Sequence, residues 1–343
     1  MTKPKKWLSD LHNHLNGSVS WDFLSRTATK NARMDEYNKL VKLKEDYHKL
    51  AAEQPEEGFA KNVITLIWQQ FEFIHQIIQD LSDIYEAVLD VVENTVAEYI
   101  EIRTTPKKLK GESRDKYIDT FVAALNKANE TIKDKQAFGL LSLDRTVHTL
   151  ADAEQFIHRI RENRAVLHGL DISGNPAAAR TLTGDQLHDV VLLALNSDIP
   201  IAVHMAETKS KIEEDDTDCV LMALEQWKLK QPAQVKNLFE GKVRLGHCIY
   251  LTEQQQKKIA ELQIPIEICP TCHSRLNWHL EKDPHPVRGV YDDISDPVTI
   301  GTDDETLFSA TAETEVRHGI GFFHNRKGLT EEQIMVHQAK YRF

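Results

Sequence analysis

Eight short apolar runs recur along the chain, and each of them ends abruptly in polar residues or glycine. Each run has the length and the β-branched content that are typical of a buried strand. Between most runs, apolar residues recur at three-to-four spacing, as in Ile84, Ala87, Val88 and Val91, which predicts amphipathic helices. The predicted strands are Trp7–Leu11, Tyr99–Arg103, Phe138–Asp144, Val166–Gly174, Ile199–His204, Val243–His247, Ile264–Cys269 and Pro297–Asp304.

This alternation of strands and helices predicts a parallel sheet, and eight such units favour a (β/α)8 TIM barrel over an open, doubly wound sheet. An open sheet usually carries a glycine-rich phosphate loop after its first strand, and the sequence contains neither a G-x-G-x-x-G nor a Walker A pattern. We therefore expect one α/β barrel domain over residues 1–343. The stretch of about residues 20–98 is longer than one crossover needs, which predicts a helical insertion between the first and second strands.

Charge and composition exclude several classes of function. The chain has 42 Lys plus Arg against 53 Asp plus Glu, a net charge of −11, and it has no local basic stripe, so we expect no polynucleotide partner. No window approaches the roughly 18 consecutive apolar residues of a membrane span, and no secretory signal is apparent at the start. With 4 cysteines a disulfide scaffold is not expected, and we predict a cytoplasmic protein.

Histidine is abundant, with 16 copies against 4 cysteines, so a metal site would use nitrogen and oxygen ligands. His12 and His14 directly follow the first predicted strand and lie two residues apart, so that, if the strand continues through them, both point to the same face. Active sites of TIM barrels assemble where the strands end. Five of the eight runs end in ligands or proton carriers, namely His12 with His14, Asp144, His204 with Glu207, His247, and Asp303 with Asp304.

This pattern predicts one catalytic zinc ion per chain. Two histidines of the first strand, His204 of the fifth and Asp303 of the eighth give Zn²⁺ a nitrogen and oxygen set with an open position for water. Zinc lowers the pKa of bound water to about 7 and so supplies hydroxide at neutral pH. Glu207 and His247 add a carboxylate and an imidazole for moving protons.

Together these motifs resemble the adenosine deaminase family of amidohydrolase-type barrels. The resemblance runs from about residue 8 to about residue 310 and keeps the motifs in the family's order. The motifs that carry it are His12-x-His14-Leu15-Asn16-Gly17-Ser18, Ile74-His75-Gln76, Tyr99-Ile100-Glu101-Ile102-Arg103-Thr104-Thr105-Pro106, Leu170-Asp171-Ile172-Ser173-Gly174, His204-Met205-Ala206-Glu207, Leu245-Gly246-His247, Cys269-Pro270-Thr271 and Thr302-Asp303-Asp304.

The resemblance implies a role for each of these positions. Glu207 would protonate the purine N1, and His247 would orient and deprotonate the zinc water and stabilise the developing oxyanion. Asp304 would hydrogen-bond the purine N7, and the backbone of Gly174 would contact N3. Hydroxide would add to C6, and ammonia or an amine would leave without any redox cofactor. The implied zinc ligands are His12, His14, His204 and Asp303.

Asn16 bears on whether the substrate carries a 5′-phosphate. The nucleoside-specific branch of the family typically has Asp at this position, where its carboxylate meets the ribose 5′ end and would repel a phosphate. Asn removes that charge, and Ser18 adds a hydroxyl, a combination compatible with an oxyanion. Arg103–Lys107, Asp144-Arg145 and Ser173–Pro176 also look most like the adenosine deaminase-like branch that acts on N6-methyl-AMP.

We therefore expect a purine nucleoside or nucleotide as the small-molecule substrate, and favour hydrolysis of N6-methyl-AMP to IMP and methylamine. Deamination of adenosine to inosine is the alternative, in which Asn16 merely caps a turn. The oligomeric state stays open. The residues expected to bind the substrate are Asn16, Ser18, Thr104, Asp144, Gly174 and Asp304.

Position 272 departs from the family, because relatives usually carry Ser-Asn where this chain has Cys272-His273. Cys269-x-x-Cys272-His273 also fits the pattern of c-type haem attachment, and C-x-x-C suggests a thiol redox pair, which is a remote alternative. Haem attachment requires export, for which the sequence shows no signal, so we expect reduced cysteines instead.

The apolar patch in the predicted insertion leaves two roles open. It would form either part of the core or a lid over the base, and its residues are Trp68, Phe71, Phe73 and Ile74.

Overall fold

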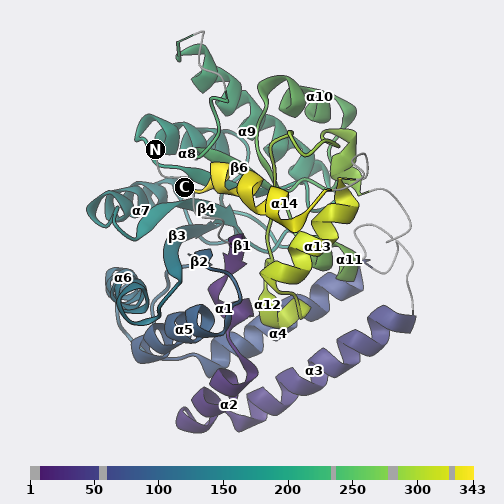
Figure 1. The fold of residues 1–343 in the computed structure, drawn as a ribbon. Helices are drawn as coiled ribbons and strands as arrows, with labels where there is room; N and C mark the ends of the chain where they lie inside the picture. Colours follow the sequence, from purple (N-terminus) through teal and green to yellow (C-terminus); the bar gives the residue numbers. More distant parts are fainter. Residues whose placement is uncertain (1–7, 54–59, 233–236, 277–284, 324–328) are drawn as a thin grey trace.

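The apolar runs form eight parallel strands that are arranged in chain order, from β1 to β8, in a barrel surrounded by helices (Figure 1). The computed structural model describes residues 8–53, 60–232, 237–276, 285–323 and 329–343. Each predicted run overlaps one strand, and the predicted fold class is confirmed; Trp7 lies outside the described residues. The strands are β1 (Ser9–His14), β2 (Tyr99–Thr104), β3 (Gln136–Asp144), β4 (Leu167–Ser173), β5 (Ile201–Met205), β6 (Val243–His247), β7 (Ile266–Ile268) and β8 (Val298–Ile300).

The barrel comes together between β8 and β1. A parallel bridge joins Asn13 to Asp303. The backbone N–H of His14 donates to the Asp303 carbonyl at 2.7 Å, and the backbone N–H of Asp303 donates to the His12 carbonyl at 2.8 Å. These bonds hold the ends of the first and last strands side by side, so that ligands far apart in the sequence meet.

One main helix follows each of the middle strands and packs on the outside of the barrel. Ser113, Ser210 and Thr252 begin three of these helices, where the hydroxyl accepts a hydrogen bond from a backbone N–H of the first turn. Among the described residues, no helix is both long and apolar enough to cross a bilayer. These helices are α6 (Arg114–Thr131), α7 (Leu150–Glu162), α8 (Asp185–Asn196), α9 (Lys211–Leu229) and α10 (Glu253–Leu262).

Shorter elements follow the last two strands. Pro270 occupies the first turn of the helix after β7, where its missing N–H is not needed. The segments after β7 are α11 (Pro270–Arg275) and the 3₁₀ helix η2 (Pro286–Gly289), and those after β8 are α12 (Glu305–Phe308), α13 (Ala312–Phe322), α14 (Glu331–Gln338) and η3 (Ala339–Tyr341).

Five helices lie between β1 and β2. The last of them packs beside α6 as a barrel helix, whereas α2, α3 and α4 gather on one side of the barrel near α12 (Figure 1). Ile74 and Ile77 of α4 are buried in the main core. Residues 54–59 of the expected insertion lie outside the described residues. The five helices are α1 (Leu15–Ser18), α2 (Trp21–Lys30), α3 (Met34–Glu53), α4 (Ala60–Ile77) and α5 (Leu81–Asn94).

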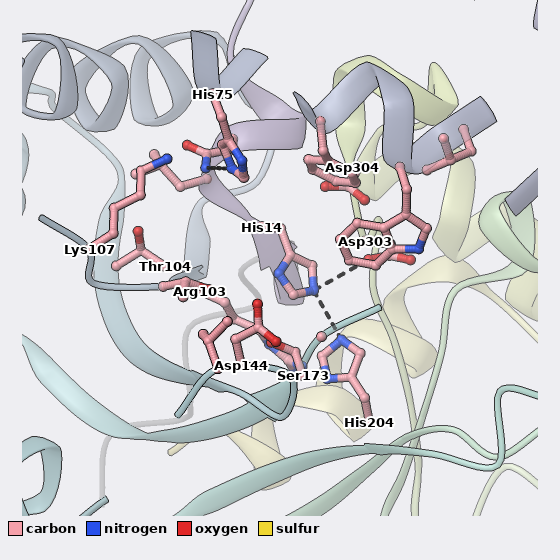
Figure 2. A pocket seen from close by; sticks show the side chains of 18 of the residues that line it. His14, His75, Arg103, Thr104, Lys107, Asp144, Ser173, His204, Asp303 and Asp304 are labelled. Carbon is pink, nitrogen blue, oxygen red and sulfur yellow. Dashed lines mark hydrogen bonds and ion pairs between the residues drawn. The ribbon is translucent and has the colours of Figure 1, made fainter. Parts of the chain in front are cut away.

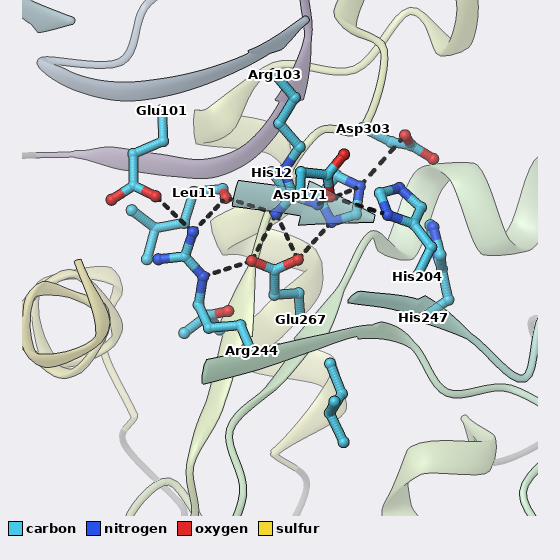
Figure 3. Close-up of polar contacts among 12 residues, drawn as sticks. Leu11, His12, Glu101, Arg103, Asp171, His204, Arg244, His247, Glu267 and Asp303 are labelled. Atoms are coloured by element: carbon cyan, nitrogen blue, oxygen red, sulfur yellow. Dashed lines mark hydrogen bonds and ion pairs between the residues drawn. The ribbon is translucent and has the colours of Figure 1, made fainter. Parts of the chain in front are cut away.

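The barrel interior contains a buried network of charges (Figure 3). Arg244 of β6 pairs with both Glu101 and Glu267, and Arg103 pairs with Glu267 from the other side. All four side chains are fully buried. The guanidinium of Arg244 also donates to the Tyr341 carbonyl at 2.6 Å. Charges buried this deeply are tolerated because each one has charged or hydrogen-bonding partners.

Replacement of Arg244 by Met should destabilise the protein strongly. It would leave two buried carboxylates short of a cation, and breaking a buried pair in this way costs about 3–5 kcal/mol. Denaturant titration of the free energy of unfolding measures the effect. Lys42→Met is the control, because Lys42 and Asp46 form an exposed pair and exposed pairs contribute little. Equal, small changes in the two variants would contradict a stabilising role for the interior network.

Candidate active site

Three histidines and an aspartate from three strand ends meet at one point in the barrel; Figure 2 shows His14, His204 and Asp303, and Figure 3 shows His12 beside them. The Nε2 atom of His14 lies 3.1 Å from Nε2 of His204 and 3.4 Å from Oδ1 of Asp303. Nε2 of His12 lies 3.6 Å from the same oxygen. Ligand atoms of His12, His204, His247 and Asp303 all lie within 4.8 Å of one another. The structure thus gathers all four predicted ligands, together with His247.

The donor set fits a divalent transition metal. Burial lowers the pKa of His14 to about 3, so its ring is neutral and keeps a lone pair at neutral pH. Although burial opposes it, hydrogen bonding with His12 holds the pKa of Asp303 well below its usual range. Imidazole nitrogens beside an ionised carboxylate are ligands that zinc binds readily. We conclude that this group of side chains can hold a metal ion.

Buried acceptors behind the cluster orient two of the rings. Nδ1 of His12 lies 2.8 Å from Oε2 of Glu267, and Nδ1 of His204 lies 3.1 Å from the carbonyl of Ile172 and 3.2 Å from Oδ1 of Asp171. An acceptor at Nδ1 keeps the proton there and leaves Nε2 free to bind a metal. Neither Glu267 nor Asp171 was predicted to have a role. In the sequence, each is an acidic residue between two apolar residues of a strand.

Glu207 follows β5 and is held by two buried groups. Its Oε1 accepts a hydrogen bond from Nη2 of Arg145 at 2.8 Å, and its backbone N–H donates to Glu213 at 2.9 Å. Burial raises the pKa of the Glu207 carboxyl, and the neighbouring Glu213 adds to this against the opposing effect of Arg145. A carboxyl with a raised pKa can hold a proton and donate it. Sequence reasoning did not anticipate the contact with Arg145.

Asp304 points into the cavity with an oxygen to spare. Its Oδ1 is buried and has no hydrogen-bond partner among the described residues. Burial, and then the adjacent Asp303, raise the pKa of Asp304 well above its usual range. Gly17 makes room for this side chain, because a Cβ at Gly17 would lie 1.7 Å from Oδ1 of Asp304. An unpartnered buried oxygen of this kind is suited to meeting a ligand.

The backbone is strained where the metal cluster forms. His247 and Asp303 both have a φ of +64°. Non-glycine residues rarely adopt this left-handed conformation, which costs about 1–3 kcal/mol and occurs mostly where function requires it. At both strand ends the strained turn places a side chain of the cluster. Burial also lowers the pKa of His247 well below its usual value.

The cluster opens into a cavity of about 540 Å³, a volume typical of small-molecule sites. Figure 2 shows Lys107 and Thr104 on the opposite side of His14 from Asp303. Trp68 of α4 lines the cavity as well. Of the six residues expected to bind the substrate, five line this cavity, namely Asn16, Thr104, Asp144, Gly174 and Asp304.

Ser18 is the sixth of these residues, and the structure places it outside the cavity lining. Its hydroxyl accepts a hydrogen bond from the backbone N–H of Glu305 at 3.1 Å, at the start of α12. The amide of Asn16 is also engaged, because its Nδ2 lies 2.9 Å from Nε2 of His75. Burial lowers the pKa of His75 to about 3, so this ring is neutral and accepts the hydrogen bond. Lys107 is a half-buried cation that also lines the cavity.

The aromatic patch divides between the two expected roles. Trp68 and Phe71 line the cavity, whereas Ile74 is buried in the main core and Phe73 packs against it.

The redox alternative finds no support. Cys269 and Cys272 are buried free thiols, and burial raises the pKa of each well above its usual value. The ring of His273 contacts two other imidazoles, with its Nε2 2.9 Å from Nδ1 of His247 and its Nδ1 2.7 Å from Nε2 of His285.

Comparisons with known proteins agree with this geometry. A protein of Danio rerio named N6-methyl-AMP deaminase is 24% identical over 344 residues, which cover 95% of this chain and 86% of that protein. The apo structure of the N6-methyl-AMP deaminase from Arabidopsis thaliana has a TM-score of 0.73 at 22% identity, covering 96% of this chain and 89% of that one. Arabidopsis ADAL complexed with IMP has a TM-score of 0.68 at 21% identity, covering 92% and 85%.

The match to a family model covers nearly the whole chain. The amidohydrolase family model matches residues 8–334. Such a match includes every strand of the barrel and every residue of the metal cluster. This chain therefore belongs to the amidohydrolase family of hydrolases.

Proposed function

We propose that the chain is a zinc-dependent purine aminohydrolase, and that its preferred reaction is the hydrolysis of N6-methyl-AMP to IMP and methylamine. The observation that carries the proposal is the meeting of His12, His14, His204 and Asp303 beside Glu207 in one cavity. Membership of the amidohydrolase family supports the reaction class. The names of the relatives, and the IMP complex of Arabidopsis ADAL, support a purine nucleotide as substrate.

The proposed metal chemistry is simple. His12, His14, His204 and Asp303 would hold the zinc ion. When bound, zinc lowers the pKa of a water molecule to about 7 and supplies hydroxide at neutral pH. The acceptors at Glu267 and Asp171 keep the ligand rings turned the right way.

The remaining residues act on the purine. Glu207 donates a proton to N1, which makes C6 electrophilic, and its raised pKa keeps that proton available. The raised pKa of Asp304 favours its protonated form, whose O–H can donate to the N7 lone pair. Gly174 has a φ of +123°, and a Cβ there would lie 2.5 Å from Asp144. Glycine therefore fits this position where a side chain would collide with Asp144, and the family resemblance implies that its backbone contacts N3.

The phosphate would lie at the end of the cavity away from Asp303 and Asp304. Lys107 and Thr104 lie there (Figure 2). Burial lowers the pKa of Lys107 to about 8, so its ammonium group is still mostly charged at neutral pH. A half-buried cation pairs more strongly with a phosphate than an exposed one, because water screens it less. Position 16 carries no opposing charge, since Asn replaces a carboxylate there.

Glu207→Gln should retain zinc and lose nearly all turnover. Glutamine keeps the shape of the side chain but has no proton to give to N1, and loss of a general acid costs about 10²–10⁴-fold. Steady-state kcat measures the turnover, and elemental analysis measures the zinc content. A rate close to that of the unmodified enzyme would remove Glu207 from the mechanism.

His204→Ala should lower the zinc content well below one ion per chain. The substitution removes one nitrogen from the cluster and leaves the network in the barrel interior in place. Elemental analysis of the purified protein measures the loss. His188→Ala is the matched control, since His188 is hydrogen-bonded to Gln226 on the outer helices. This variant should keep its zinc. Full zinc occupancy in His204→Ala would contradict the proposed ligand set.

The substrate is tested by kcat/KM for N6-methyl-AMP, AMP, N6-methyladenosine and adenosine, measured side by side. The nucleotides should be preferred, and Lys107→Met should reduce kcat/KM for them by about 10–100-fold while changing the nucleosides little. Because Lys107 loses its charge as the pH rises through about 8, kcat/KM for nucleotides should fall above that pH.

Lys110→Met serves as the control, because Lys110 is paired with Asp80 outside the cavity lining. A preference for unphosphorylated substrates would establish the adenosine alternative instead.

A further inference from the structure

Three imidazoles form a continuous row behind the cavity. Nδ1 of His247 lies 2.9 Å from Nε2 of His273, and Nδ1 of His273 lies 2.7 Å from Nε2 of His285. At η2, the backbone N–H of Val287 donates to Nδ1 of His285 at 3.3 Å. All three rings are buried. The family resemblance gives the first ring a part in moving protons and gives the other two rings no role.

The direction of every hydrogen bond in this row follows from its last member. A neutral imidazole has one nitrogen that donates and one that accepts. Because the N–H of Val287 needs a lone pair on Nδ1 of His285, the proton of that ring lies on Nε2. His285 then donates to Nδ1 of His273, which places the His273 proton on Nε2. In turn His273 donates to Nδ1 of His247, whose own proton must lie on Nε2.

We propose that His273 and His285 are positioning residues that hold His247 as its Nε2–H tautomer. His247 lines the cavity, and its Nδ1 is the nitrogen that contacts His273, so Nε2 is the nitrogen on the other side of the ring. The ring therefore presents a hydrogen-bond donor to the cavity. The opposite tautomer would set two N–H groups against each other between His247 and His273.

A fixed donor at this place has a chemical consequence, which rests on the proposed function. As an oxygen nucleophile adds to C6 of the purine, negative charge develops in the cavity. A donor that is already oriented stabilises that charge without having to reorganise. In its resting state His247 therefore acts through its N–H, and it has no free lone pair with which to take a proton from water.

His247, Cys269 and His273 also lie close enough together to be a second metal group. The separation of 2.9 Å between the two imidazole nitrogens is that of a hydrogen bond. Burial also raises the pKa of the Cys269 thiol well above its usual value, which disfavours the thiolate that a metal needs. The contacts therefore favour a hydrogen bond between His247 and His273 over a second metal site.

The tautomer can be observed directly by NMR of the zinc-loaded enzyme labelled with ¹⁵N-histidine, at a pH near 7.5. The His247 signals are identified by their loss in His247→Gln. We expect a protonated Nε2 and an unprotonated Nδ1. A proton on Nδ1, or on both nitrogens, would overturn the proposal, and so would a zinc content of two ions per chain. This measurement needs no turnover, so it stands even where no purine is a substrate.

Paired variants of His273 connect the tautomer to activity. His273→Asn keeps an N–H donor for Nδ1 of His247, whereas His273→Leu removes it. We expect His273→Leu to lose the single tautomer and about 10–100-fold of kcat, with KM within about threefold and zinc content unchanged. His273→Asn should keep the tautomer and lose less than about fivefold.

A second pair tests the end of the row. His285→Gln can accept from Val287 and donate to His273, and it should resemble the unmodified enzyme, whereas His285→Leu should resemble His273→Leu. Circular dichroism establishes that each variant is folded. Equal behaviour of the two members of either pair would contradict a role through hydrogen bonding.

Discussion

The carboxylate of Glu267 joins the stability of the barrel to the chemistry of the site. It accepts hydrogen bonds from Arg103 and Arg244 on one side and contacts Nδ1 of His12 on the other. Figure 3 shows it between Arg244 and His12. The two guanidinium groups hold the pKa of Glu267 well below its usual range despite burial, so it stays an acceptor. The orientation of the first metal ligand thus depends on charges that neutralise the barrel interior.

Charged groups also connect the barrel interior to the site at other strand ends. Asp171 accepts a hydrogen bond from Arg103 and also lies against His204, while Arg145 holds Glu207 and the carbonyl of His204. Arg103 and Arg145 therefore each connect the barrel frame to a group of the site. Because these groups are rigidly supported, the site can place its donors before a substrate arrives, which is the arrangement that electrostatic catalysis requires.

Sequence patterns predicted the strands and the metal cluster for one reason. Apolar runs with polar ends are local signals, and barrel topology alone brings those ends together. The supporting residues could not be found in this way, because His12 and Glu267 are 255 residues apart and the sequence gives no pairing between them. The hydroxyl of Ser18 was expected near a phosphate. It contacts α12 instead, since helix α1 turns it toward the backbone of that segment, which periodicity does not reveal.

Residues 341–343 pack against the buried Arg244 and Glu101 inside the barrel. The carbonyl of Tyr341 accepts from Arg244, the backbone N–H of Phe343 donates to Glu101 at 2.9 Å, and the ring of Phe343 lies 3.6 Å from the Arg244 guanidinium. During synthesis on the ribosome these partners emerge after all eight strands. A nascent barrel therefore keeps Arg244 and Glu101 incompletely partnered until residues 341–343 have left the exit tunnel, so its interior is completed only after all eight strands have been made.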